Sequence, residues 1–340
     1  MTSPDPQLLE LGWKPFFSEQ LSAEEVASLQ PVRVMAVHRG KIAVAGSGGD
    51  RLITPSLPDG DAQEYQPAVG DWAVIDRESV QLSRILRRSS VFKRRAPGND
   101  RQLQLIAANV DTVFIVASCT REFNLARLER YLILAREVGV HPVLVLTKAD
   151  LADRPETFAE AARGLQAGLD VAIINARDPA SAGSLAGWCT IGETVALLGS
   201  SGVGKSTLIN TLRGSDSLAT QAVREADGKG RHTTTAREMH RLAGGGWLLD
   251  TPGMRELQLS DAAAGLADVF EDILSLAQDC KFSNCAHESE PACQVQAALR
   301  SGALDPVRLE RWRKLTAEDD LNTVSLSERR GRADPFGERR

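Results

Sequence analysis

A nine-residue stretch near the middle of the chain has the residue types and spacing of a phosphate-binding loop. It reads GSSGVGKST over residues 199–207 and satisfies the pattern G-x-x-x-x-G-K-[ST] in full. Glycines let the backbone wrap a phosphate with its N–H groups pointing inward, and the N-terminus of a following helix adds partial positive charge. We expect Lys205 to contact the β- and γ-phosphates and the Ser206 hydroxyl to hold Mg²⁺. The predicted nucleotide-binding residues of this loop are Gly199, Ser200, Ser201, Gly202, Val203, Gly204, Lys205, Ser206 and Thr207.

The flanking residues predict the strand and the helix that such a loop requires. Residues 194–198 are apolar and predict a short buried strand, whereas residues 205–212 have helical spacing. A chance glycine-rich turn is the alternative, but it gives no reason for Gly, Gly, Lys and Ser to fall in register. We therefore interpret the stretch as a P-loop.

The base that accompanies the phosphates is predicted from TKAD at residues 147–150, which follows a strand expected over 142–146. The Asp150 carboxylate can accept hydrogen bonds from N1–H and the 2-amino group of guanine, whereas adenine offers no such pair of donors. Lys148 would lay its alkyl stem over the base. The related motif N-K-x-D begins with Asn, so Thr147 predicts the loss of an amide brace to the P-loop and a somewhat lower guanine affinity. The predicted base-binding residues are Thr147, Lys148, Ala149 and Asp150.

A γ-phosphate-sensing element is predicted after a strand at 247–250. The sequence DTPG at 250–253 fits D-x-x-G, in which Asp250 would hold Mg²⁺ through water and the Gly253 N–H would face the γ-phosphate. The pattern is common by chance, and its place one strand and one loop after the P-loop gives it weight. Either Thr233 or Thr234 would supply a further hydroxyl to Mg²⁺, and the sequence leaves that choice open.

His232 is the predicted catalytic residue. Many GTPases position the attacking water with Gln directly after D-x-x-G, but this chain has Met254 there. His232 lies in GRHTTT at 230–235, on the loop expected to close over the γ-phosphate, and could orient the water instead. A solvated loop histidine is the alternative.

Three of the five cysteines lie with a histidine in the pattern C-x4-C-x-H-x5-C near the C-terminal end. Three thiolates and an imidazole predict one tetrahedral, structural zinc site per chain, with no position left for water. The predicted ligands are Cys280, Cys285, His287 and Cys293. Helices expected at 266–276, 295–299 and 306–315 offer too little core to be stable alone, so the metal would supply folding energy. A coincidental cluster is the alternative.

The composition indicates a globular protein. The 340 residues are 42% hydrophobic and 25% charged, with a net charge of −5, which argues against a globally basic nucleic-acid binder. No apolar run approaches the roughly 18 residues of a membrane span, and the start lacks the features of a signal peptide. We expect a cytoplasmic monomer with no membrane partner. One local cluster, either a solvated face or a phosphate contact, contains Arg84, Arg87, Arg88, Lys93, Arg94 and Arg95.

Changes of pattern predict a multidomain chain. Residues 1–30 form an extension, and 31–98 contain five short strands that suit a small all-β OB-fold barrel. Strands alternate with helices over 99–258, as in a doubly wound P-loop α/β domain. A small helical zinc-binding domain over 259–325 and a basic tail over 326–340 complete the chain.

The order of the motifs is permuted, because the base motif at 147 precedes the P-loop at 199 and DTPG at 250. In a Ras-like GTPase the base motif comes last, and a circular permutation keeps the same site. The motifs occur in a specific order, which is VGDW at 69–72, TKAD, GSSGVGKST, GRHTTT, DTPG, CKFSNCAH and Cys293. On these motifs the chain resembles the circularly permuted ribosome small-subunit-dependent GTPase A family.

The resemblance implies a GTPase that acts late in maturation of the small ribosomal subunit. It implies contacts with ribosomal RNA through the barrel and the zinc domain, and weak hydrolysis of GTP to GDP until the subunit is met. It also points to His232 as the catalytic residue. The alternative function is an RNA-binding assembly checkpoint in which GTP and GDP mainly set the conformation. An ATP-driven remodeller is disfavoured by Asp150.

Overall fold

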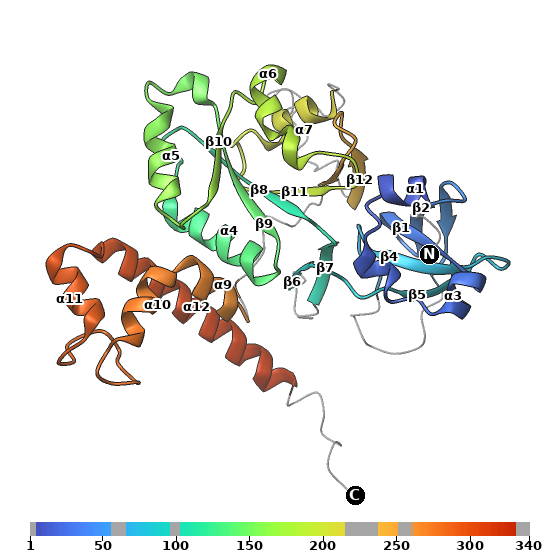
Figure 1. Ribbon diagram of the computed structural model, residues 1–340. Coiled ribbons are helices and arrows are strands. Elements are labelled where there is room, and N and C mark those ends of the chain that lie inside the picture. The colour runs from blue at the N-terminus through green and yellow to red at the C-terminus, as the bar shows by residue number, and fades with distance from the viewer. Residues whose placement is uncertain are drawn as a thin grey trace, which may run out of the picture. The chain divides into compact units, whose positions relative to one another are not determined.

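The computed structural model describes residues 5–55, 66–95, 103–214, 237–250, 259 and 261–330, and the chain divides into two compact units (Figure 1). The first unit contains residues 1–123, 138–164 and 168–257. The second contains residues 124–137, 165–167 and 258–340. The predicted barrel and most of the predicted GTPase domain therefore share one unit, whereas residues 124–137 group with the residues of the predicted zinc-binding domain.

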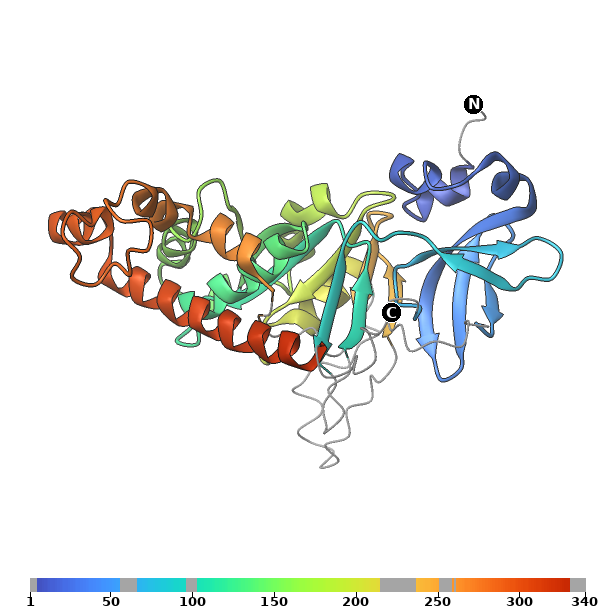
Figure 2. The same ribbon diagram turned by 90° about the horizontal axis from the view of Figure 1, so that it is seen from below.

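The five short strands predicted near the N-terminus are present in the first unit. They are β1 (Leu29–His38), β2 (Lys41–Gly46), β3 (Arg51–Ile53), β4 (Trp72–Asp76) and β5 (Leu82–Ile85), in the antiparallel order β5-β4-β1-β2-β3. Alternation along β1 and β2 turns Val34, Ile42 and Val44 inward, where each is at most 1% exposed. Figure 2 shows the antiparallel hairpin that follows, formed by β6 (Val91–Arg95) and β7 (Leu103–Ala108).

Strands β1 to β5 and the turns that the structure describes between them are called the β-domain below. The N-terminal extension covers part of this β-domain. It contains three short helices, α1 (Pro6–Glu10), α2 (Pro15–Ser18) and α3 (Ala23–Ser28), the last of which begins with a capping box between Ser22 and Glu25. The rings of Trp13 and Phe17 pack against Trp72 of β4, with centroids 4.8 and 5.8 Å away. The extension thereby buries one face of β4.

The strands of the predicted GTPase domain continue the same sheet. β10 (Asp170–Ile173), β9 (His141–Thr147), β8 (Thr112–Ser118), β11 (Thr194–Leu198) and β13 (Trp247–Asp250) pair in parallel in this order. Every residue of β8 and β11 is buried, as expected of strands in a doubly wound sheet. β12 (Arg237–Arg241) lies antiparallel between β13 and β1 and joins the two parts into one eleven-stranded sheet. The helices α6 (Pro179–Ala182) and α7 (Lys205–Arg213) lie side by side, and α5 (Pro155–Arg163) packs on β10 and β9 (Figure 1).

The second unit is helical. It contains α4 (Leu125–Glu137), α9 (Ala263–Val269), α10 (Glu271–Gln278), α11 (Gln294–Ser301) and the long α12 (Pro306–Arg330), drawn in red in Figure 2. The single helix predicted over 266–276 is wrong, because the backbone leaves the helical region at Phe270 (φ −110°, ψ 33°). This break places the fully buried Phe270 ring 4.7 Å from the guanidinium of Arg308. The helix predicted to end at 315 continues to Arg330.

A buried ionic network holds α4 in the second unit. Glu129 of α4 is fully buried and accepts hydrogen bonds from Arg308 at 3.0 Å and Arg311 at 2.7 Å, both on α12. Arg308 also pairs with Asp272 of α10 at 2.7 Å. Burial raises the pKa of Glu129 above its ordinary value, although the two guanidinium groups act against it. Loss of these partners would leave an uncompensated carboxylate in the interior.

Among the residues that the structure describes, none of the helices combines sufficient length with sufficient apolar character to cross a bilayer.

Candidate functional site

The P-loop connects β11 to α7, and its conformation explains its glycines. Gly199, Gly202 and Gly204 have φ angles of +147°, +81° and +97°, which residues with side chains rarely adopt. A Cβ atom on Gly199 would lie 2.4 Å from the carbonyl oxygen of Val116 in β8, so this position also requires close backbone approach. Gly204 caps α7 without a side-chain acceptor, which leaves the first-turn N–H groups to an anionic ligand.

The two side chains predicted to handle phosphate and Mg²⁺ lie in the first turn of α7. Lys205 is 8% exposed, and its ammonium donates hydrogen bonds to the carbonyl oxygens of Gly199, at 2.7 Å, and of Ser200. Ser206 is half-buried beside it. The structure therefore brings the cation, the hydroxyl and the backbone loop together at the carboxyl end of β11, where doubly wound domains bind ligands.

Thr147, the first residue of the base motif, braces the P-loop through its hydroxyl. The side chain is fully buried at the end of β9, and Oγ1 lies within hydrogen-bond distance of the carbonyl oxygens of Val203 in the P-loop and, at 3.1 Å, Ala117 in β8. A hydroxyl has one proton and so donates to one of these acceptors at a time. The predicted loss of the brace is therefore wrong, because the threonine hydroxyl reaches the P-loop backbone directly.

The rest of the base motif forms a tight turn. Lys148 has a left-handed backbone (φ +56°), and the 3₁₀ turn η2 (Ala149–Leu151) follows it. The Ala149 N–H donates to the carbonyl oxygen of Ile174, at 3.4 Å, which ties the turn to the end of β10. Asp150 is exposed and Lys148 half-buried, so both carboxylate and alkyl stem are accessible to a ligand.

The sequence did not point to a second hydrogen bond that braces the P-loop helix. Thr211 of α7 donates a hydrogen bond at 2.6 Å to the carbonyl oxygen of Ala176, in the loop after β10. The P-loop helix therefore also holds the loop that neighbours the base motif. The available signal was its position one helical turn after Thr207, on the same face of α7.

Several predicted residues fall outside the described part of the chain. These are His232, Thr233, Thr234 and Gly253, together with the side chain of Asp250. The backbone of Asp250 is described as the last residue of β13, opposite Glu238 of β12. The D-x-x-G sequence thus begins where a parallel strand of the sheet ends, as predicted.

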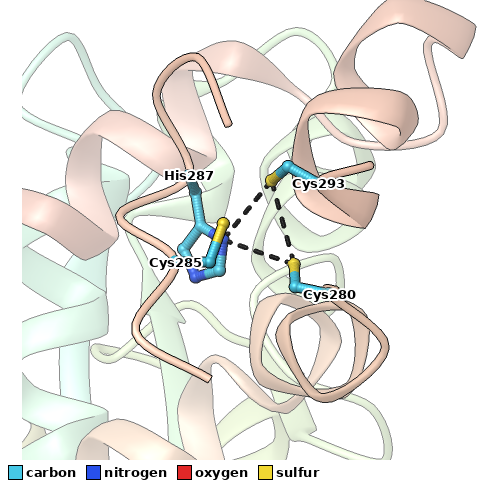
Figure 3. A group of neighbouring side chains, drawn as sticks. All are labelled: Cys280, Cys285, His287 and Cys293. Atoms are coloured by element: carbon cyan, nitrogen blue, oxygen red, sulfur yellow. Dashed lines mark hydrogen bonds between the residues drawn. The ribbon is translucent and has the colours of Figure 1, made fainter. Parts of the chain in front are cut away.

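The four predicted metal ligands converge on one point in the second unit (Figure 3). Their ligand atoms all lie within 4.8 Å of one another. The Sγ atoms of Cys280 and Cys293 are 3.8 Å apart, and the Nδ1 atom of His287 lies 3.6 and 3.5 Å from them. Tetrahedral bonds of about 2.3 Å to sulfur and about 2.0 Å to nitrogen separate the ligand atoms by about 3.5 to 3.8 Å. The cluster therefore has the dimensions to hold one metal ion.

Alongside burial, the close approach of the sulfur atoms in the cluster shifts the pKa values of two of its thiols in opposite directions. Burial and the neighbouring sulfur atoms raise the pKa of the Cys285 thiol to about 11. Burial likewise acts to raise the pKa of Cys280, but backbone N–H groups of Gln294 and Val295 bring it below its ordinary value. Thiolates at these distances repel one another, and a coordinated divalent cation offsets that repulsion and deprotonates the thiols.

Three side chains that the sequence did not single out hold the ligand loop. His287 has a left-handed backbone (φ +59°), and its carbonyl oxygen accepts hydrogen bonds from Gln296 at 2.6 Å and Arg313 at 2.7 Å. Glu290 accepts hydrogen bonds from three backbone N–H groups of the loop, at 2.8, 2.8 and 3.1 Å. Contacts of this kind fix the orientation of metal ligands. The available signal for Glu290 was its place between the third and fourth ligands.

Comparison with known proteins decides the family. The family model described as RsgA GTPase matches residues 85–260. The chain belongs to the RsgA GTPase family. A small ribosomal subunit biogenesis GTPase RsgA from Mesorhizobium japonicum is 50% identical over 99% of this chain and 97% of its own length. A small ribosomal subunit biogenesis GTPase RsgA 2 from Vibrio vulnificus is 45% identical over 99% of this chain and 95% of its own length.

Two solved structures share the fold at lower identity. YjeQ from Thermotoga maritima has a TM-score of 0.63 at 22% identity and covers 85% of this chain and 98% of its own. A structure described as YloQ, a circularly permuted GTPase, has a TM-score of 0.60 at 23% identity over 88% and 97%. The predicted permuted GTPase fold is confirmed, since β9 with the base motif precedes β11 with the P-loop. As a member of the RsgA GTPase family, the chain is a GTP hydrolase.

The basic cluster predicted between residues 84 and 95 has a partly structural role in this RsgA family member. Arg84 pairs with Glu25 at 2.9 Å. Arg88 forms two hydrogen bonds, at 2.7 and 2.8 Å, with the fully buried carboxylate of Asp71. Among the cluster residues whose side chains the structure describes, Arg87 and Lys93 are exposed. The first half of the cluster therefore contributes contacts within the β-domain.

Proposed function

We propose that this chain binds the small ribosomal subunit and its ribosomal RNA and acts late in subunit maturation, with GTP hydrolysis stimulated by the subunit. The observation that carries the proposal is the match along 99% of the chain to relatives named small ribosomal subunit biogenesis GTPase. The exposed side chains of Arg87 and Lys93 support this proposal, because cations of this kind can contact phosphates. Such a factor would work in the cytoplasm, and we expect a monomer.

The decisive experiment measures GTP hydrolysis with and without purified small ribosomal subunits. We expect many-fold stimulation that weakens as salt is added, because phosphate contacts release counterions. Purified large subunits are the matched control and should stimulate little. Equal rates with the two kinds of subunit would contradict the proposal.

Within the nucleotide site, Lys205 would bind the β- and γ-phosphates, and Ser206, Asp250 and one of the adjacent threonines, Thr233 or Thr234, would hold Mg²⁺. Asp150 would select guanine. The exposed carboxylate of Asp150 supports this, because it is free to accept two hydrogen bonds from the base. Asp150→Asn should shift the preference from GTP toward xanthosine triphosphate, and an unchanged preference would reject the assignment.

His232 would orient the attacking water. Its position in the sequence GRHTTT, five residues before β12, and Met254 in place of a glutamine support this role. We expect His232→Ala to lower kcat and to leave GTP affinity nearly unchanged, since the residue would act only on the γ-phosphate side. If turnover equals that of the native chain, another group positions the water.

The ion held by Cys280, Cys285, His287 and Cys293 would be zinc in a structural role, one per chain. The three thiols and one imidazole support this, because that donor set at tetrahedral distances suits zinc. Metal analysis of the purified folded protein should find about one zinc per chain. Folded protein without metal would refute the assignment.

A second function, an RNA-binding checkpoint that uses nucleotide mainly as a conformational switch, makes a different prediction. It requires a non-hydrolysable GTP analogue to hold the protein on the subunit and GDP to release it, with little acceleration of hydrolysis by the subunit. Co-sedimentation with each nucleotide, read beside the hydrolysis rates, separates the two functions.

A further inference from the structure

The strand that follows GRHTTT is held by the β-domain. β12 begins at Arg237, two residues after that motif, and its first two residues pair with β1, with Val37 opposite Arg237 and Ala36 opposite Glu238. On its other side Glu238 lies opposite Asp250, the last residue of β13. One row of paired residues therefore runs from Ala36 in the β-domain to the first residue of DTPG.

A second contact joins the β-domain to β13. Gly70, in the turn before β4, has a φ of +89°, and its carbonyl oxygen accepts a hydrogen bond from the Asn109 side chain at 3.0 Å. A Cβ atom on Gly70 would lie 2.2 Å from the carbonyl oxygen of Ala108 and 3.2 Å from a methyl carbon of Leu249 in β13. The turn is therefore packed between Ala108 of β7 and Leu249 of β13, with no space for a methyl group.

A third contact fixes β1 at the amino end of the P-loop strand. Arg33 of β1 is 1% exposed and donates hydrogen bonds to the Thr194 hydroxyl at 2.7 Å and to the carbonyl oxygen of Leu11. Burial lowers the pKa of Arg33 to about 10, so the group remains a cation at neutral pH. The β-domain is thus hydrogen-bonded to β11, which leads into the P-loop, and to β12, and it packs against β13.

We propose that β1 positions β12 and the end of β13 for hydrolysis, so that RNA held by the β-domain sets kcat through the row of β1, β12 and β13. The part about RNA rests on the proposed function, whereas the positioning of β12 and β13 by β1 does not. Hydrolysis depends on placing water and Mg²⁺ to within fractions of an ångström, whereas GDP is held by the P-loop and TKAD. A displaced β12 should therefore change kcat more than GDP affinity.

Gly70→Ala tests the link in the full-length protein, with Gly168→Ala as the matched control. Both substitutions place alanine at a positive φ, +89° and +69°, but a Cβ on Gly168 meets nothing within 4 Å. We expect Gly70→Ala to lower the basal kcat at least tenfold with GDP affinity within twofold, and Gly168→Ala to behave as the native chain. An unchanged kcat, or an equal loss of kcat and GDP affinity, would overturn the positioning role.

Amide hydrogen exchange on the native chain provides a test that does not depend on the variant folding. Coupling between two sites is reciprocal, so a γ-phosphate that is sensed through β12 should also stabilise β1. We expect slower exchange over Val34–His38 with a non-hydrolysable GTP analogue than with GDP. Identical exchange in that segment with the two nucleotides would overturn the inference.

Small ribosomal subunits distinguish the two parts of the proposal. If subunits accelerate the native chain but not Gly70→Ala, the β-domain transmits the stimulus. If they accelerate both equally, the RNA part is overturned. If they fail to accelerate the native chain, the proposed function fails, while the basal kcat of Gly70→Ala still decides whether β1 positions the site.

Discussion

The phosphate-binding loop and the metal cluster are both short and both recognisable from spacing, yet they are built on opposite principles. The P-loop binds through backbone groups, and its shape is imposed by neighbours such as Val116 in β8 and Thr147 in β9. The cluster would hold an ion through four side chains, and its loop would be shaped by that ion as well as by local contacts from Glu290 and Gln296. The first site therefore depends on the sheet around it, whereas the second depends on its own ligand. A substitution that abolishes ligand binding at one site should therefore leave the other site intact.

Removing a metal ligand should have the largest effect. We expect Cys280→Ser to lose zinc and the fold of residues 280–301, because metal binding supplies on the order of 10 kcal/mol to such domains. The network around Glu129 should keep α4 in place, so GDP affinity should change less than twofold. Zinc content and the helical signal in circular dichroism measure the loss, and the buried Cys189, mutated to Ser, is the matched control. If Cys280→Ser kept its zinc, the assignment of Cys280 as a metal ligand would be contradicted.

A methyl group in the P-loop should have the converse effect. Gly199→Ala meets both a φ of +147° and a carbonyl oxygen 2.4 Å from the new Cβ. Strain of about 3 kcal/mol would lower GTP affinity about 100-fold, measured by calorimetry, while zinc content stays unchanged. Gly139→Ala, at φ +69° with nothing within 4 Å of its Cβ, controls for backbone conformation alone. Normal GTP binding by Gly199→Ala would contradict the close approach to β8.

The hydroxyl brace of Thr147 can be tested with a nearly isosteric change. Thr147→Val keeps the shape but leaves a buried carbonyl oxygen without its donor, at a cost of about 1 to 3 kcal/mol. We expect a lower melting temperature and about tenfold weaker GTP binding. Thr147→Ser restores the donor and should recover most of both, whereas a serine variant as impaired as the valine variant would assign the effect to packing.

Glu290→Gln should give the smallest effect, on the metal side alone. Hydrogen bonds from backbone N–H groups lower the pKa of Glu290 from 4.5 to about 2. A lowered pKa means that the contribution of the carboxylate is complete above pH 4.5 and is lost only as pH falls toward about 2. Zinc release to a chelator should be severalfold faster in the variant, by the same ratio at pH 6 and pH 8. A ratio that changes between these values would show that another group holds the loop.

Local signals predicted much of the fold and of both sites. The P-loop strand at 194–198, the helix from Lys205 and the four metal ligands lie where the spacing placed them, because each depends on neighbours within a few residues. The pairing of β1 with β12 could not be predicted, since Ala36 and Glu238 are far apart in sequence and neither strand marks its partner. The burial of Glu129 could not be predicted either, because a glutamate in a helix is normally solvated. The arginines that pair with it lie 179 and 182 residues later in the sequence.

Helix α4 bears on how this protein can evolve. In sequence it lies between β8 and β9 of the nucleotide-binding sheet, yet Glu129 pairs with Arg308 and Arg311, which come 179 and 182 residues later. A gene that ended before residue 258 would lack α9, which packs on α4, and both arginines that pair with Glu129. The metal-binding part is therefore not an appendage that recombination could add, remove or exchange at one position in the chain. The GTPase and its C-terminal part must be inherited together.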